Sequence, residues 1–149
     1  MSTIAGRHNG KQLFVDVSIV SAALDHNAAV FGVAANQALF SEPVKALIDT
    51  GSTATSISPL AVQRLNLRSG GKRDMMTANG PRRARYYDFR IGFYSRREDG
   101  SAQFHILEKP VSGVALNVEN VVFDILLGMD VISQGDLIIR RDGSFTFEF

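Results

Sequence analysis

The chain has 149 residues, of which 45% are hydrophobic and 21% are charged, and its formal net charge at pH 7 is +1. This length and composition are typical of one soluble globular domain with a sizeable core. We therefore expect a single domain over residues 1–149, in which residues 1–40 form N-terminal strands or an extension. The near-zero net charge gives no indication of a nucleic-acid partner.

Several classes of site are excluded by composition. The absence of cysteine excludes disulfides, thiolate metal sites and a thiol nucleophile. The three histidines, His8, His26 and His105, have no spacing typical of metal ligands, so we expect neither a metal nor a cofactor. No signal peptide and no apolar run of about 18 residues is visible, so we expect a cytoplasmic protein without a membrane partner. A processed fragment of a larger polypeptide would have the same features.

Short runs rich in β-branched and aromatic residues predict strands along most of the chain. In chain order, the predicted strands are Leu13–Val20, Val44–Ile48, Thr55–Ser58, Asp74–Thr77, Ala84–Phe93, Ala102–Leu107, Val121–Leu127, Leu137–Ile139 and Ser144–Phe149. The segment Ala28–Phe40 is apolar and alanine-rich, and it fits either a strand with a loop or a short helix.

Cap and turn residues separate these runs. Ser58 as an N-cap and Pro59 at the first helical position predict a short helix that ends near Leu67. The pairs Asn79-Gly80 and Asp142-Gly143 each stand between two extended runs and predict hairpin turns. Many short strands with one or two short helices predict an all-β, closed fold.

The segment Asp49-Thr50-Gly51-Ser52 follows the apolar run Val44–Ile48. An acid in a tight turn at the end of a buried strand suits catalysis. The plainer alternative is an ordinary exit from a strand, in which Asp and Gly serve the turn. The tetrapeptide occurs once in the chain, so a catalytic Asp49 that needs a carboxylate partner would find it in Asp49 of a second copy.

Two segments together resemble the retropepsin-like aspartic proteases. The segment Leu47–Ser58 is similar to the active-site segment of that family, and Ile125–Ile132 is similar to its second conserved segment, where two apolar residues and a glycine lead into a short helix. Their order and the spacing of 79 residues from Asp49 to Gly128 also match. The resemblance covers about Val44–Phe149, and it implies a closed acid-protease barrel with one lobe per chain.

The resemblance implies a homodimeric endopeptidase with one Asp49 from each chain at the two-fold axis. Two neighbouring carboxylates share one proton, so the ionised one activates water and the protonated one polarises the scissile carbonyl of a peptide or protein substrate. In this scheme Thr50 bonds to the opposite loop and Gly51 lets the backbone approach the carboxylates. Ser52 hydrogen-bonds the outer carboxylate oxygen.

The resemblance also assigns the surroundings of the site. Leu127 and Gly128 pack beneath the catalytic loop. The hairpin around Asn79-Gly80 becomes a flap that closes over the substrate, although it also fits any hairpin tip. Substrate-contacting flap residues are then Met75, Met76, Thr77, Ala78, Asn79 and Gly80. Ile57 and a loop from Pro110 to Leu116 are expected to complete the substrate pockets.

Other features leave alternatives open. Asp130 fits a simple helix cap. Six arginines fit a solvated hairpin face better than a contact for an acidic substrate or nucleic acid: Arg82, Arg83, Arg85, Arg90, Arg96 and Arg97. The stripe Phe145-Phe147-Phe149 fits either a dimer interface or the core. The alternative function is a catalytically weak or inactive module for dimerisation or peptide binding, but a pure scaffold has little reason to keep Asp, Thr and Gly together.

Overall fold

The structure is a computed structural model that describes residues 3–21, 43–96, 99–116 and 122–149. Strands dominate it, and two short helices complete the described part, which confirms the predicted all-β fold. In chain order the elements are β1 (Thr3–Arg7), β2 (Leu13–Ser21), β3 (Val44–Ile48), β4 (Ser56–Ile57), α2 (Pro59–Arg64), β5 (Ser69–Thr77), β6 (Gly80–Arg96), β7 (Ala102–Ile106), β8 (Val111–Ala115), β9 (Ile125–Leu127), α3 (Met129–Ile132), β10 (Asp136–Ile139) and β11 (Ser144–Glu148). No helix in these ranges is long and apolar enough to cross a membrane.

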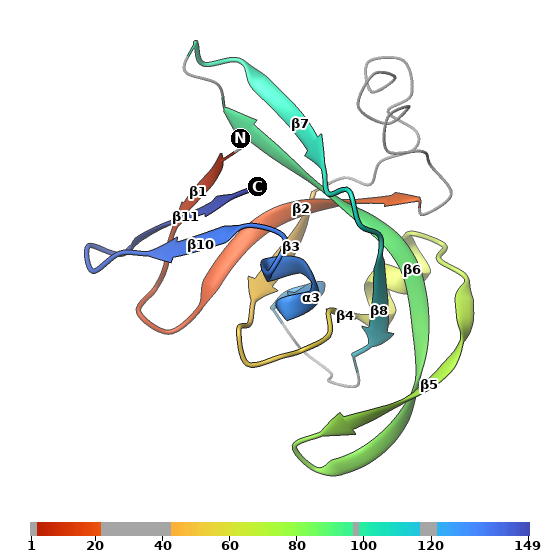
Figure 1. The fold of residues 1–149 in the computed structure, drawn as a ribbon. Coiled ribbons are helices and arrows are strands. Elements are labelled where there is room, and N and C mark those ends of the chain that lie inside the picture. Colours follow the sequence, from red (N-terminus) through yellow and green to blue (C-terminus); the bar gives the residue numbers. More distant parts are fainter. Residues whose placement is uncertain (1–2, 22–42, 97–98, 117–121) are drawn as a thin grey trace.

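Six strands pair into a closed ring. The order around it is β2, β3, β9, β4, β8 and β6, and β6 then pairs with β2 again. The strand β2 closes the ring because Leu13–Val17 pair with β3 whereas Ser18–Ser21 pair with β6. In the view of Figure 1, α3 is drawn in the middle of these strands. The closed ring agrees with the barrel that the resemblance implies.

The strand β6 has 17 residues and is the central strand of the barrel wall. Different parts of β6 pair in turn with β5, β8, β2 and β7. The sequence predicted only Ala84–Phe93 as a strand, and the observed strand is longer at both ends because neighbouring strands accompany it along its length. Phe89, Ile91 and Phe93 of β6 are almost fully buried, as the alternation of side chains across a strand requires.

A second, three-stranded sheet has the order β1-β11-β10 and joins the two ends of the described chain (Figure 1). Its inner face belongs to the core, since Phe145 is 0% and Phe147 is 4% exposed. The Phe147 ring lies 6.1 Å from the Phe93 ring and 5.4 Å from that of half-buried Phe149. Of the two alternatives for the phenylalanine stripe, the structure therefore favours the core.

Some predicted boundaries are wrong. The helix α2 has Ser58 as its N-cap, with the Ala61 amide donating to the Ser58 hydroxyl, but it ends at Arg64 rather than near Leu67. It stops there because Asn66 adopts a positive φ of 51°. The strand expected over Val121–Leu127 is reduced to β9, since residues 122–124 are not paired as strand.

Two further expectations concern segments between strands. The segment expected as a loop from Pro110 to Leu116 contains β8, which pairs with both β4 and β6 and is therefore part of the barrel wall. The segment Ala28–Phe40, for which the sequence left a strand or a short helix open, lies outside the described residues.

Candidate active site

The position of Asp49 is set by β3, which lies between β2 and β9 in the ring. The Asp49 amide donates to the Leu127 carbonyl over 3.0 Å, and this hydrogen bond between the ends of β3 and β9 fixes the first residue of the loop. The Gly51 amide donates to Asp49 Oδ1 over 2.9 Å and orients the carboxylate. A Cβ on Gly51 would lie only 3.2 Å from that oxygen, so a glycine at this position avoids crowding the carboxylate.

Beneath this loop, α3 is attached through backbone hydrogen bonds. The Met129 amide donates to the Ser52 carbonyl over 2.8 Å, and the Asp130 amide donates to the Thr53 carbonyl over 3.2 Å. The first amides of a helix have no acceptor within the helix, and here two carbonyls of the loop accept hydrogen bonds from them. A Cβ on Gly128 would lie 2.6 Å from the backbone carbon of Ala54, so only glycine fits there. Gly128 thus lies directly beneath the loop, as expected.

A buried threonine joins the loop to the second conserved segment. The Thr55 hydroxyl donates to Asp130 Oδ1 over 2.7 Å and accepts from the Gly128 amide over 3.1 Å. The Thr55 amide donates to the other carboxylate oxygen of Asp130 over 3.1 Å. The expectation that Asp130 caps α3 is therefore wrong: the N-cap is Gly128, without a side-chain bond. Because 75 residues separate Thr55 from Asp130, no local sequence signal indicated this pair.

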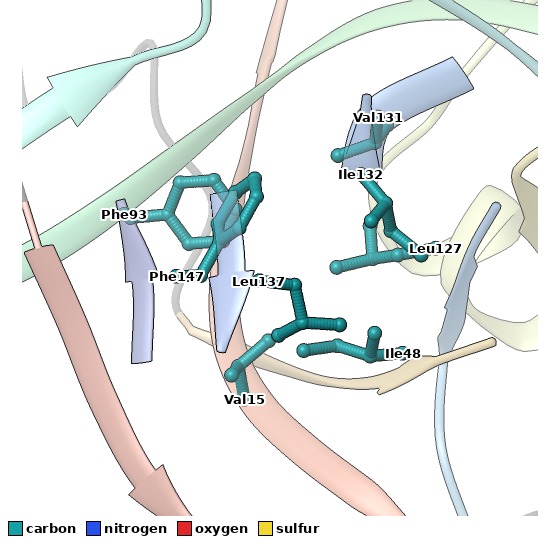
Figure 2. A pocket seen from close by; sticks show the side chains of 8 residues that line it. All are labelled: Val15, Ile48, Phe93, Leu127, Val131, Ile132, Leu137 and Phe147. Carbon is teal, nitrogen blue, oxygen red and sulfur yellow. The ribbon is translucent and has the colours of Figure 1, made fainter. Parts of the chain in front are cut away.

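A small apolar cavity of about 10 Å³ lies beside the two conserved segments, and Figure 2 shows the side chains that line it. Its lining residues come from the barrel, from α3 and from the terminal sheet: Val15, Ile48, Phe93, Leu127, Val131, Ile132, Leu137 and Phe147. All are apolar, so a water molecule there would find no side-chain hydrogen-bond partner. Ile48 and Leu127 directly precede Asp49 and Gly128, so packing around this cavity supports both conserved segments.

The remaining loop residues are placed as follows. Asp49 is half-buried, whereas Thr50 and Gly51 are exposed in the single chain. Within the described part of the chain the Thr50 side chain makes no hydrogen bond, so its hydroxyl is available to a group outside the chain. Ser52 differs from the expectation, because its hydroxyl donates to the Ala54 carbonyl over 2.8 Å rather than to the Asp49 carboxylate.

The predicted flap is the hairpin of β5 and β6, whose tip lies toward the bottom of Figure 1, as does the loop between β3 and β4. Ala78 and Asn79 form the turn, and Gly80 follows them in the strand with a φ of +103°. The Thr77 hydroxyl donates to the Gly80 carbonyl over 2.8 Å and accepts from the Asn79 amide over 3.2 Å. These bonds give the tip a defined shape.

The two faces of this hairpin differ. Met75 is paired with Arg82, whose guanidinium donates to the Ala115 carbonyl of β8 over 3.2 Å. Met75 and Arg82 thus share the face that is turned toward the barrel wall. Met76 lies on the opposite face and is 76% exposed. Sequence reasoning grouped Arg82 with the other arginines and gave it no separate role.

Ile57 is placed where no substrate can touch it. It is 0% exposed and lies in β4, between β8 and β9, where it packs in the barrel core. The expectation that Ile57 lines a substrate pocket is wrong for this arrangement. Among the described residues, no group of three or more His, Asp or Glu side chains is arranged to hold a metal ion.

Comparisons with known proteins bear on the loop and on the segment beneath it. A search of curated proteins finds no match to this chain. Among solved structures, the chain is similar to a retropepsin-like aspartic protease from Rickettsia conorii, with 15% sequence identity, a TM-score of 0.49, and coverage of 99% of this chain and 94% of that chain. A family model described as aspartyl protease matches residues 33–131, about two thirds of the chain, and so includes both Asp49 and Gly128. The chain therefore belongs to the aspartyl protease family.

Proposed function

We propose that this protein is an aspartic endopeptidase that acts as a homodimer, with one Asp49 from each chain in a shared site. The main observation behind the proposal is the Asp49 loop. The segment that begins at Gly128 packs against this loop and donates backbone hydrogen bonds to its carbonyls. The chain contains this Asp-Thr-Gly sequence once, and the mechanism of the family needs two carboxylates. A second copy supplies the second one.

In the proposed reaction a water molecule lies between the two carboxylates. The pair holds one proton, since two carboxylates about 3 Å apart do not both ionise readily. The ionised Asp49 removes a proton from the water as it attacks the peptide carbonyl, and the protonated Asp49 donates a hydrogen bond to the carbonyl oxygen. The Gly51 amide supports the geometry, since it already holds one oxygen of each carboxylate.

We further propose that a peptide binds in an extended form between the loop and the β5–β6 hairpin. Thr77, Ala78, Asn79 and Gly80 at the hairpin tip would close over it, and the face that carries Met75 would be turned toward it. Met76 would make contact only if the hairpin twists, because its side chain lies on the opposite face in the single chain.

The direct test is cleavage of a peptide library by the purified protein at mildly acid pH. The variant Asp49→Asn should lose activity, and a transition-state-mimic inhibitor should block the wild type. A matched control is Asp16→Asn, which changes an exposed acid on β2 in the same chemical way. Equal products from the wild type and Asp49→Asn, or no products from either, would reject the enzyme. A variant that still dimerises and binds peptide, together with an inactive wild type, would favour the binding module instead.

Two kinetic measurements test the shared site. The rate should have a bell-shaped dependence on pH, because activity needs one proton on the pair. A rate that rises continuously into alkaline pH would contradict the mechanism. Activity per chain should also fall on dilution, because a monomer holds one carboxylate only. Specific activity that stays constant while the dimer dissociates would contradict a shared site.

A further inference from the structure

The arginines of the β5–β6 hairpin have different surroundings. Arg83 and Arg85 are exposed, and the Arg83 side chain lies 4.0 Å from the Asp74 carboxylate. Arg82 is half-buried, and its guanidinium donates to the Ala115 carbonyl at the end of β8 over 3.2 Å. Within the described part of the chain, no carboxylate lies within salt-bridge distance of Arg82. The structure therefore separates Arg82 from the solvated arginines of the hairpin.

The inner face of the hairpin, which carries Met75 and Arg82, is positively charged. Directly opposite residues of an antiparallel pair share a face, and the faces alternate along each strand. Arg82 is opposite Met75, so Arg73, two residues before Met75, lies on the inner face as well. Asp74 is the one acid in β5, and it lies on the outer face opposite Arg83. The paired part of the hairpin thus has two cations and no acid on its inner face.

The neighbouring elements do not neutralise this charge. The guanidinium of Arg73 stacks on the Tyr86 ring, with 4.2 Å from its central carbon to the ring centroid. The strand β8, against which Arg82 lies, has the sequence VSGVA and contains no ionisable side chain. The next acid on the same side of β6 is Asp88, six residues and about 20 Å farther along the strand from Arg82. In the described part of the chain, the Arg82 charge therefore has no counter-ion.

A half-buried guanidinium without a counter-ion is a favourable site for an anion. Burial of a charge is costly unless the charge is paired, so an arriving carboxylate recovers part of this cost. The guanidinium has five N–H donors in a planar fork that matches the two oxygens of a carboxylate. The described structure uses the Arg82 fork for a hydrogen bond to a neutral carbonyl, which is weaker than one to a carboxylate.

We propose that Arg82 determines substrate specificity by binding the carboxylate of an Asp or Glu side chain in the peptide. The proposal rests on the proposed function, in which the peptide lies between the Asp49 loop and the inner face of the hairpin. The Arg82 fork turns from the Ala115 carbonyl to the carboxylate, and the charge of Arg73 on the same face adds to the attraction.

The proposed homodimer contains two copies of Arg82, related by the two-fold axis that passes between the two Asp49 carboxylates. The scissile bond lies at this axis, so the two arginines are equally distant from it, one on each side. An acidic residue should therefore be favoured at two positions of the substrate, at equal distances before and after the cleaved bond.

Substrate pairs that differ only in charge test the preference. Starting from a peptide that the wild type cleaves, Glu and Gln are placed in turn at each position around the cleaved bond. The peptides are amidated at the C-terminus, so the tested side chain adds the one varied carboxylate. At about pH 6, where Glu is ionised, kcat/KM should be roughly tenfold higher for Glu than for Gln at two symmetric positions. Equal kcat/KM values at every position would overturn the proposal.

Variants assign the preference to one side chain. Arg82→Gln keeps a donor for the Ala115 carbonyl and removes the charge, so the Glu-to-Gln ratio should fall to about one. Arg82→Glu should instead favour Lys over Gln at the same positions. The control Arg83→Gln removes the neighbouring charge on the outer face and should keep the wild-type ratio. If Arg82 were only structural, Arg82→Gln would change kcat/KM equally for both peptides and leave the ratio unchanged, which would also overturn the proposal.

The pH dependence of the wild-type ratio provides a test without a variant. The substrate Glu becomes neutral below about pH 4.3, whereas Arg82 stays charged, so the ratio should fall toward one in acid. Both peptides share the pH dependence of the enzyme itself, and the ratio therefore isolates the substrate carboxylate. A ratio that stays constant through this range would contradict binding of the ionised side chain.

The outcomes separate this proposal from the proposed function. If the wild type cleaves no peptide, or if Asp49→Asn cleaves as well as the wild type, both proposals are wrong. If the wild type cleaves peptides without a preference for Glu, or if Arg82→Gln keeps that preference, the role of Arg82 is wrong and the protease stands. Should Arg82→Gln fold poorly, as judged by circular dichroism, the pH dependence of the wild-type ratio decides alone.

Discussion

The variant Thr55→Val tests whether the link between the two conserved segments stabilises the protein. Valine has nearly the same shape as threonine, so the substitution removes the hydroxyl and keeps the volume at a site that is 0% exposed. The hydroxyl makes two hydrogen bonds, to Asp130 Oδ1 and from the Gly128 amide. Both are lost, and neither segment can compensate by a local shift, because Gly128 already touches the Ala54 backbone.

The magnitude follows from what each partner can do afterwards. The Gly128 amide is buried and would be left without a partner, which costs about 1–3 kcal/mol. The Asp130 carboxylate is exposed, so water replaces much of its lost bond, and that loss adds about 1 kcal/mol. The free energy of unfolding should therefore fall by about 2–4 kcal/mol in total. For a chain of this size, the Tm should fall by about 5–15 °C.

The assay is chemical denaturation of the wild type, Thr55→Val and Thr55→Ser at one protein concentration, because dimerisation would make stability depend on concentration. Thr55→Ser keeps the hydroxyl and loses a methyl group, so it should cost less than Thr55→Val. The reverse order would show that methyl packing, rather than the hydrogen bonds, stabilises this region. A double-mutant cycle with Asp130→Asn should give a coupling energy of at least about 0.5 kcal/mol, whereas additive effects would contradict the link.

Three further predictions concern the same support and the terminal hairpin. Gly128→Ala should destabilise the protein by about 1–3 kcal/mol and lower kcat/KM for peptide cleavage, because the new Cβ would overlap the Ala54 backbone; unchanged thermal unfolding and activity would refute this. Leu127→Ala should cost about 2–5 kcal/mol in chemical denaturation, because it enlarges an apolar cavity, and a cost below about 1 kcal/mol would show that the region collapses around it. The Ser144 hydroxyl and amide donate hydrogen bonds to the Asp142 carboxylate and lower its pKa below the ordinary 3.8. The ionised Asp142 therefore stabilises the folded state fully at pH values above 3.8, and this stabilisation is lost as the pH falls through the lowered pKa. Asp142→Asn should therefore be less stable than the wild type near neutral pH and equally stable at strongly acid pH, and a difference that persists in acid would contradict the assignment.

Features that depend on a few consecutive residues were predicted correctly from the sequence. The strand Val44–Ile48 has its predicted bounds, and Ser58 caps α2 as expected. The hairpin at Asp142-Gly143 forms because Gly143 adopts the positive φ that the turn requires. For the cap and the turn, the deciding interaction joins residues no more than about four positions apart, so the sequence pattern contains it.

The tertiary structure decided the features that join distant residues. The sequence alone determined that Asp49 follows a buried strand in a tight turn, and that Gly128 belongs to the segment that supports it. Only the fold determined that Thr55 meets Asp130, that Ile57 is covered on all sides, and that Arg82 reaches the end of β8. The physical reason is that burial and side-chain partners depend on which strands become neighbours, and the closed ring brings together residues that are far apart in the chain.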